Sequence, residues 1–179
     1  LTIARAFAIP GLAIPLSCIF VFEFANMVYP TLWAFWGREV FGWNGFTIGL
    51  TLSAYGVLIA VVQAGVLPKL TMGLGDYKTL VIATFAAVIG FVGFGFSSAV
   101  WVVAVLLPVA ALSDMAPPLM TAFAANRVGE DQQGLVQGVI ASLASVSAVL
   151  APLALTGVFE TFVDSEGVYF PGARFLLAA

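Results

Sequence analysis

Residues that usually carry chemistry are scarce in this chain. It has no histidine, a single cysteine (Cys18), and only 8% charged residues among 179. Zinc and haem sites draw mainly on histidine and cysteine, so a metal would find almost no ligands here. One cysteine also excludes an internal disulfide. The sequence therefore predicts no metal site and no cofactor.

Enzyme and nucleic-acid-binding motifs are missing as well. The sequence contains no nucleophile elbow, phosphate-binding loop or metal-ligand cluster. Its six Lys and Arg residues form no basic patch of the kind that binds nucleic acid. We expect neither an enzyme nor a nucleic-acid partner.

Apolar residues take the place of the missing charge and make up 62% of the chain. Soluble domains have about 45–50% apolar and about 25% charged residues. A chain of this length cannot bury so much apolar surface in water. The composition predicts an all-α integral membrane protein whose solvent is the lipid bilayer.

Uncharged runs divide the chain into membrane spans. No charge occurs from Gly45 to Leu67 or from Thr79 to Val109, and only a short basic turn separates these runs. Each run is long enough to cross about 30 Å of hydrocarbon. We expect five full spans and the start of a sixth, at about 7–36, 46–67, 79–96, 102–125, 133–159 and 172–179.

Prolines are expected to interrupt two of these spans. Proline has no backbone N–H, so it leaves the carbonyl four residues earlier without its donor and kinks the helix. The prolines concerned are Pro10, Pro15 and Pro30 in the first span, and Pro108, Pro117 and Pro118 in the fourth.

Tryptophans and small residues give two further expectations. Trp33, Trp36 and Trp43 flank the charged pair Arg38–Glu39, where an interfacial aromatic belt is typical. In the fifth span, small residues recur every four positions, a pattern that lets helices approach closely in lipid. The first such row is Gly134, Gly138 and Ser142.

The basic residues indicate an orientation. If the spans alternate, Arg5, Lys69, Lys78 and Arg127 fall on one side, and Arg38 and Arg174 on the other. The positive-inside rule places the larger group, and with it the N-terminal end, in the cytoplasm. The chain starts without Met and stops in an apolar run. We therefore expect a piece of a longer protein.

Two carboxyl groups within the spans are the strongest candidates for function. Glu23 lies near the middle of the first span and Asp114 near the middle of the fourth, with no Lys or Arg at similar depth. An ionisable residue at mid-helix costs about 2.5–3.5 kcal/mol on insertion scales. Burial disfavours the charged form, which suits a group that takes up and releases protons. The structural alternative is a carboxyl that stays protonated or pairs with a cation elsewhere.

Four other polar residues interrupt the apolar spans. Asn26 is one turn from Glu23 and shares its helix face. Tyr55 and Gln63 lie in the second span, and Gln137 lies one turn into the fifth. Hydrogen bonds between helices explain any of the four at least as well as contact with a ligand.

Three stretches resemble one transporter family. Leu74–Leu80 (LGDYKTL) resembles the cytoplasmic signature loop between the eighth and ninth helices of the major facilitator superfamily. Glu130–Gly138 (EDQQGLVQG) and the sequence FGWN at 41–44 resemble its tetracycline-efflux branch of drug:proton antiporters. The loop residues that match are Gly75, Asp76 and Lys78, whereas Met72 stands at the signature's aspartate position.

The resemblance implies a fold and a function. The fold is the C-terminal six-helix half of a twelve-helix transporter, with the N-terminal half as its partner. The function is secondary active transport, namely proton-coupled efflux of a small, amphipathic, tetracycline-like compound across a bacterial inner membrane. The alternative is a transporter-like assembly factor or structural subunit without transport activity. A matching upstream half would favour transport.

Overall fold

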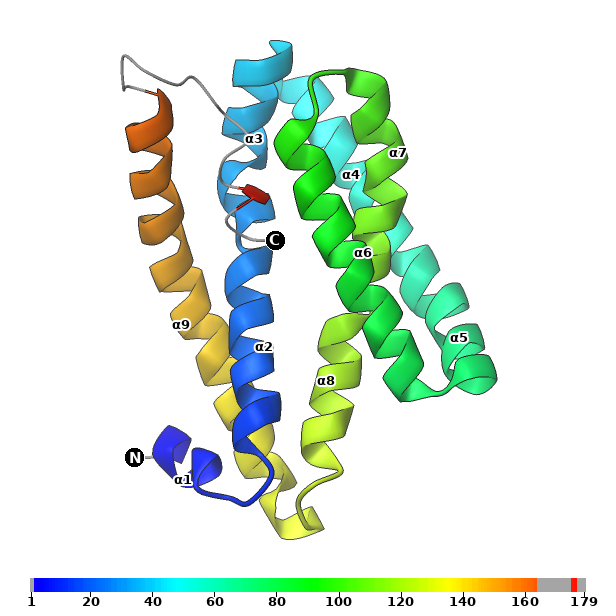
Figure 1. The fold of residues 1–179 in the computed structure, drawn as a ribbon, viewed down its shortest axis with the longest axis vertical. Helices are drawn as coiled ribbons and strands as arrows, with labels where there is room; N and C mark the ends of the chain where they lie inside the picture. Colours follow the sequence, from blue (N-terminus) through cyan, green and yellow to red (C-terminus); the bar gives the residue numbers. More distant parts are fainter. Residues whose placement is uncertain (1, 164–174, 177–179) are drawn as a thin grey trace.

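The computed structural model describes residues 2–163 and 175–176, and all regular structure in that part of the chain is helical. Five helical segments lie side by side as a bundle (Figure 1). Each is long and apolar enough to cross a membrane, as the composition predicts for an all-α membrane protein. These segments are Ala13–Phe41, Gly45–Leu74, Asp76–Phe96, Val100–Ala125 and Glu130–Ala154.

Three of the five segments are interrupted near their middles, and two are continuous. The interrupted ones consist of α2 (Ala13–Asn26) and α3 (Val28–Phe41); α4 (Gly45–Val61), the π-helix η1 (Val62–Val66) and α5 (Leu67–Leu74); and α7 (Val100–Ser113) and α8 (Ala116–Ala125). The continuous helices are α6 (Asp76–Phe96) and α9 (Glu130–Val163). A short helix, α1 (Thr2–Phe7), precedes the bundle.

The first span lies further along the chain than the expected range 7–36. A turn with Gly11 at φ +80° separates α1 from α2. At the other end the helix continues through Arg38 to Gly42, whose φ of +65° ends it. The Gly42 N–H caps the Arg38 carbonyl at 2.9 Å. Glycine suits both turns because it adopts positive φ without strain.

The prolines differ in their effects on the helices. Helix α7 continues through Pro108, so the expected interruption there was wrong. Pro117 and Pro118 instead follow directly on the break between α7 and α8. Pro30 lies just after the break at Met27. The sequence predicts the interruptions of the first and fourth spans, but not the π-helix in the second.

The predicted belt of Trp33, Trp36 and Trp43 was also wrong, because the three rings are buried in the core. Trp33 and Trp36 pack on Phe94 of α6, and the Trp33 and Phe94 ring centroids are 5.3 Å apart. Trp43 packs in turn on Trp33 and Trp36. The Trp33 indole N–H donates to Thr51 Oγ1 at 2.9 Å. A tryptophan whose polar end finds a partner inside a bundle has no need of the interface.

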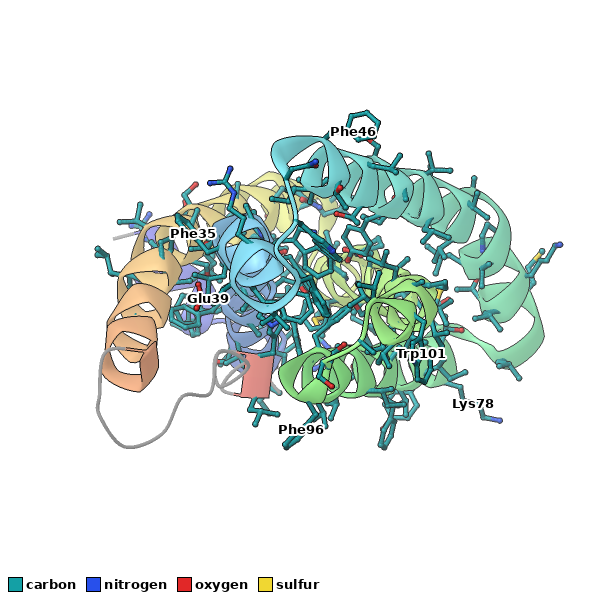
Figure 2. All side chains as sticks on the ribbon, turned by 90° about the horizontal axis from the view of Figure 1, so that it is seen from above. Phe35, Glu39, Phe46, Lys78, Phe96 and Trp101 are labelled. Carbon is teal, nitrogen blue, oxygen red and sulfur yellow. The ribbon has the colours of Figure 1, made fainter. Side chains whose placement is uncertain are left out.

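Other large apolar side chains cover the outside of the bundle. Phe46, Phe96 and Trp101 project outward at its rim (Figure 2) and are 67–80% exposed. Water would penalise such a surface, whereas lipid does not. The chain is therefore an integral membrane protein.

Close backbone packing occurs on α6 and is absent from the predicted row on α9. A Cβ atom on Gly90 would lie 3.6 Å from Ala110 Cα of α7. By contrast, a Cβ atom on Gly134 or Gly138 would meet nothing within 4 Å among the described residues. The expectation that these two glycines pack against another helix is not met within this part of the chain.

The expected start of a sixth span at 172–179 lies outside the described residues, except for Phe175 and Leu176. Phe175 is buried against Trp36, with ring centroids 5.1 Å apart. Phe175 is part of the aromatic core and packs there beside residues of α3.

Candidate functional site

The candidate site is centred on Asp114, which lies at the break in the fourth span. Helix α7 ends at Ser113 and α8 begins at Ala116. Neither Pro117 nor Pro118 has an N–H, so the carbonyls of Ser113 and Asp114 lack their usual donors four residues later. Open backbone of this kind is tolerated at membrane depth where it is buried in protein or lines a cavity.

A tyrosine from another span binds the Asp114 side chain. The Tyr55 hydroxyl of α4 donates to Asp114 Oδ2 over 2.6 Å, and both side chains are half-buried. The distance lies at the short end of the range for O–H···O hydrogen bonds. Two residues 59 positions apart, both predicted as site residues, are thereby brought together.

A glutamine from the π-helix faces the same break. Gln63 Nε2 lies 3.4 Å from the backbone carbonyl of Asp114, the carbonyl whose donor is lost at Pro118. The distance is at the long end for a hydrogen bond. The Gln63 side chain extends from η1, and single π-turns are frequent at functional sites. Gln63 therefore satisfies the opened backbone while Tyr55 satisfies the side chain.

The second carboxyl group, Glu23, approaches the cluster from α2. It is half-buried and lies within electrostatic range of Asp114. It makes no side-chain hydrogen bond to any described residue. Asn26, one turn further along α2, has its Oδ1 atom buried without a partner in the described part of the chain. Glu23 thus lies near Asp114 without bonding to it, and Asn26 makes no hydrogen bond to the described residues of the cluster.

Tyr29 belongs to the same region and was missed at the level of the sequence. Its ring centroid lies 5.8 Å from that of Tyr55, and its buried hydroxyl has no partner among the described residues. A signal was present, because Glu23, Asn26 and Tyr29 follow one another at intervals of three residues on one helical stripe. Tyrosine is common in apolar cores, and this concealed the pattern.

Comparison with known proteins gives the family. The Major Facilitator Superfamily matches residues 3–152, which is most of the chain. The chain belongs to this superfamily. Its relatives include a class G tetracycline resistance protein of Vibrio anguillarum, 32% identical over 86% of this chain and 39% of that protein.

More distant relatives come from bacteria and mammals. A class C tetracycline resistance protein of Escherichia coli is 27% identical over 80% of this chain and 36% of that protein. Hippocampus abundant transcript-like protein 1 of Homo sapiens is 26% identical over 79% of this chain and 31% of that protein. The chain thus spans less than half the length of these relatives. No solved structure matches it significantly.

The other site residues that the sequence predicts lie apart from the Asp114 cluster. Gly75, Asp76 and Lys78 are exposed at the turn between α5 and α6, at one end of that helix pair (Figure 1). Gly75 has a φ of +83°, which the tight turn requires. Gln137 is exposed on α9 and makes no side-chain hydrogen bond to a described residue.

A large groove in the bundle holds none of the predicted site residues. It has a volume of about 990 Å³ and lies between α2, α6 and α8. Its lining is mainly apolar, and among the described residues Arg127 is the one charged side chain that reaches it. Binding sites combine apolar walls with a few convergent polar groups. The cluster around Asp114 has such groups, so we place the candidate site there.

Proposed function

We propose that this chain is the C-terminal half of a proton-coupled exporter and that Asp114 takes up and releases the transported proton. The observation that carries the proposal is the Tyr55–Asp114 hydrogen bond at a helix break in mid-span. A carboxyl group there costs several kcal/mol to insert, and such groups mark ion and substrate pathways. Transporters also place their sites near the midplane, where helices are discontinuous.

The electrostatics of the cluster favour reversible protonation of a carboxyl group. The Lys and Arg residues in the described part of the chain belong to helix ends and turns, away from the break. Without a nearby cation, a buried carboxylate gains from taking up a proton, and a second carboxylate beside it adds to that gain. Glu23 supplies the second carboxylate.

We infer the substrate class from the relatives and from the surroundings of the cluster. The names of two of them refer to tetracycline resistance. A small amphipathic compound of that type would meet Tyr55, Gln63 and Asn26 as hydrogen-bonding groups. The N-terminal half of the transporter would supply the facing wall, because alternating access moves one bundle against another around the site.

We propose that the end of the bundle that carries α1 faces the cytoplasm of a bacterial cell. The turns between α5 and α6 and between α8 and α9 lie at the same end as α1 (Figure 1). Arg5, Lys69, Lys78 and Arg127 belong to these elements. Positive charge near short loops is retained on the cytoplasmic side.

Transport by the full-length protein tests the proposal. The protein is reconstituted into vesicles, and tetracycline uptake is followed after a pH gradient is imposed. We expect uptake that stops when a protonophore removes the gradient. Uptake that ignores the gradient would contradict proton coupling. A folded protein that moves no drug-like compound would favour the structural-subunit alternative.

A further inference from the structure

Tyr29 has a hydroxyl group that the described conformation leaves unused. The residue is 9% exposed, and the hydroxyl finds no hydrogen-bond partner in the described part of the chain. An unsatisfied buried hydroxyl costs about 1–3 kcal/mol, so a phenylalanine would fill this position at less cost. The presence of a hydroxyl at this position therefore calls for a functional explanation.

The surrounding structure holds the ring firmly and makes room for the oxygen. The Tyr29 ring stacks on Phe91, with centroids 5.3 Å apart, and meets Phe94 edge-on at 6.0 Å. A Cβ atom on Gly90 would lie 3.4 Å from the Tyr29 hydroxyl oxygen, at the short end of ordinary van der Waals contact. A side chain larger than that of alanine would therefore crowd the hydroxyl.

The candidate hydrogen-bond acceptors for the Tyr29 hydroxyl belong to the Asp114 cluster. Tyr29 lies within electrostatic range of Asp114, and its ring neighbours that of Tyr55. Among the described residues, Asp114 Oδ1 accepts no hydrogen bond, and Oδ2 accepts one, from Tyr55. A charged carboxylate has about four acceptor positions, whereas a protonated carboxyl needs fewer donors. The conformation described thus suits the protonated form.

We propose that Tyr29 is a positioning residue whose hydroxyl donates to the Asp114–Tyr55 pair when Asp114 is charged and is released when Asp114 is protonated. The proposal rests on the role of Asp114 in proton coupling. Both residues lie at or near a helix break, where the backbone can move. Tyr29 is two residues from the break at Met27, and Asp114 lies in the break before α8. Hydrogen bonds to a charged group are about twice as strong as neutral ones, which provides the driving force.

The ionisable groups that interact with Tyr29 come from two elements, Tyr55 from α4 and Asp114 from the end of α7. Glu23 of α2 lies within electrostatic range of Asp114 and so acts on the same cluster. Any effect of pH on Tyr29 therefore has to be separated from protonation of Glu23, and a Glu23→Gln background does so.

The test replaces Tyr29 with Phe in the full-length transporter, with Tyr77→Phe as the matched control. Tyr77 is 72% exposed at the start of α6, far from the cluster, and its loss removes the same hydroxyl. Infrared spectroscopy detects the C=O stretching band of the protonated Asp114 carboxyl group, which is assigned by its absence in Asp114→Asn. The intensity of this band is followed against pH, and thermal stability is measured in parallel.

We expect Tyr29→Phe to keep or raise thermal stability, because the ring contacts remain and an orphan hydroxyl is lost. The Asp114 band should nevertheless persist to higher pH by about one unit, since the charged form has lost a donor. The pH optimum of uptake should move in the same direction. Tyr77→Phe should leave the thermal stability and the Asp114 band unchanged.

Two results would overturn the inference, and the first of them leaves the proposed function standing. A band that titrates in Tyr29→Phe as in the unmodified protein would show that the hydroxyl is passive. A band that never titrates would overturn the inference together with the proposed proton-carrying role of Asp114. The proposed function fails separately, if Asp114→Asn transports normally while the Tyr29→Phe band still shifts.

Discussion

Carbonyls that prolines leave without a donor are satisfied here by polar side chains from elsewhere in the chain. Gln63 approaches the carbonyl freed by Pro118, and Arg127 Nη1 donates at 2.9 Å to the Gly11 carbonyl, four residues before Pro15. A backbone group without a partner in hydrocarbon costs several kcal/mol. These two carbonyls therefore each depend on one distant side chain.

Replacement of Gln63 by Leu tests this dependence. The variant leaves the Asp114 carbonyl without its side-chain donor, so the free energy of unfolding should fall by about 0.6 kcal/mol, the average for such bonds in membrane helices. Gln133→Leu is the control, because Gln133 is exposed on α9 and makes no side-chain hydrogen bond to a described residue. Unfolding in mixed detergent micelles measures both. Equal stabilities would mean that the 3.4 Å contact contributes nothing.

Single residues of the site were partly predictable from the sequence. Asp114, Tyr55 and Gln63 stand out because each interrupts an apolar run, and the cost of placing polar groups in lipid identifies them. Their meeting at one break was not predictable, since it depends on how spans more than 50 residues apart pack together. Gln137 and the signature-loop residues stay predictions.

At the scale of elements, the sequence predicted the helices better than their interruptions. Uncharged runs define spans because every backbone group must be bonded within the membrane. Pro108 lies inside a continuous helix whereas Pro118 follows a break, so the presence of a proline does not by itself decide where a span is interrupted. The buried tryptophans show the same limit, because the faces that α3 and α6 turn toward each other are decided by packing.

Glycines on two helices give an element-scale prediction. Gly90→Leu should strongly destabilise the bundle, because the new side chain meets Ala110 and the Tyr29 hydroxyl within 3.6 Å. Overpacking of a core costs about 1–3 kcal/mol or more. Gly138→Leu should leave the packing of this half intact, because the space around Gly138 is open.

Thermal unfolding of both variants measures the difference. A loss of stability for Gly138→Leu in the full-length protein, at least as large as for Gly90→Leu, would show that α9 packs there against another part of the transporter. Unchanged stability for Gly90→Leu would contradict the close contact between α6 and α7.

On the scale of the whole molecule, the five spans differ in how much of their surface the chain buries. In the most apolar stretch of Gly45–Leu74, 6% of the residues are buried within the bundle. In the corresponding stretch of Asp76–Phe96, 44% are buried. The span that carries Tyr55 and Gln63 therefore turns most of its surface outward, whereas α6 fills the interior. A second half of the transporter would cover that surface at the level of the cluster.

Single-cysteine labelling tests the proposed orientation of the whole bundle. Cys18 is exposed and is replaced first. A cysteine at Gly75, before α6, should resist an impermeant thiol reagent in intact cells, whereas one at Ser98, after α6, should react. The turns that hold them lie at opposite ends of the bundle (Figure 1). Labelling at Gly75 with none at Ser98 would reverse the orientation.

The most direct test of the central claim is proton-driven uptake by Asp114→Asn in the full-length protein. Asparagine keeps the size and hydrogen bonding of the side chain but removes the exchangeable proton. Uptake into inverted vesicles driven by a pH gradient should collapse, while energy-independent exchange of substrate survives and Asp114→Glu retains part of the activity. Normal gradient-driven uptake by Asp114→Asn, with Asp114→Glu the more damaging change, would contradict the claim and leave Glu23 as the remaining candidate in this half.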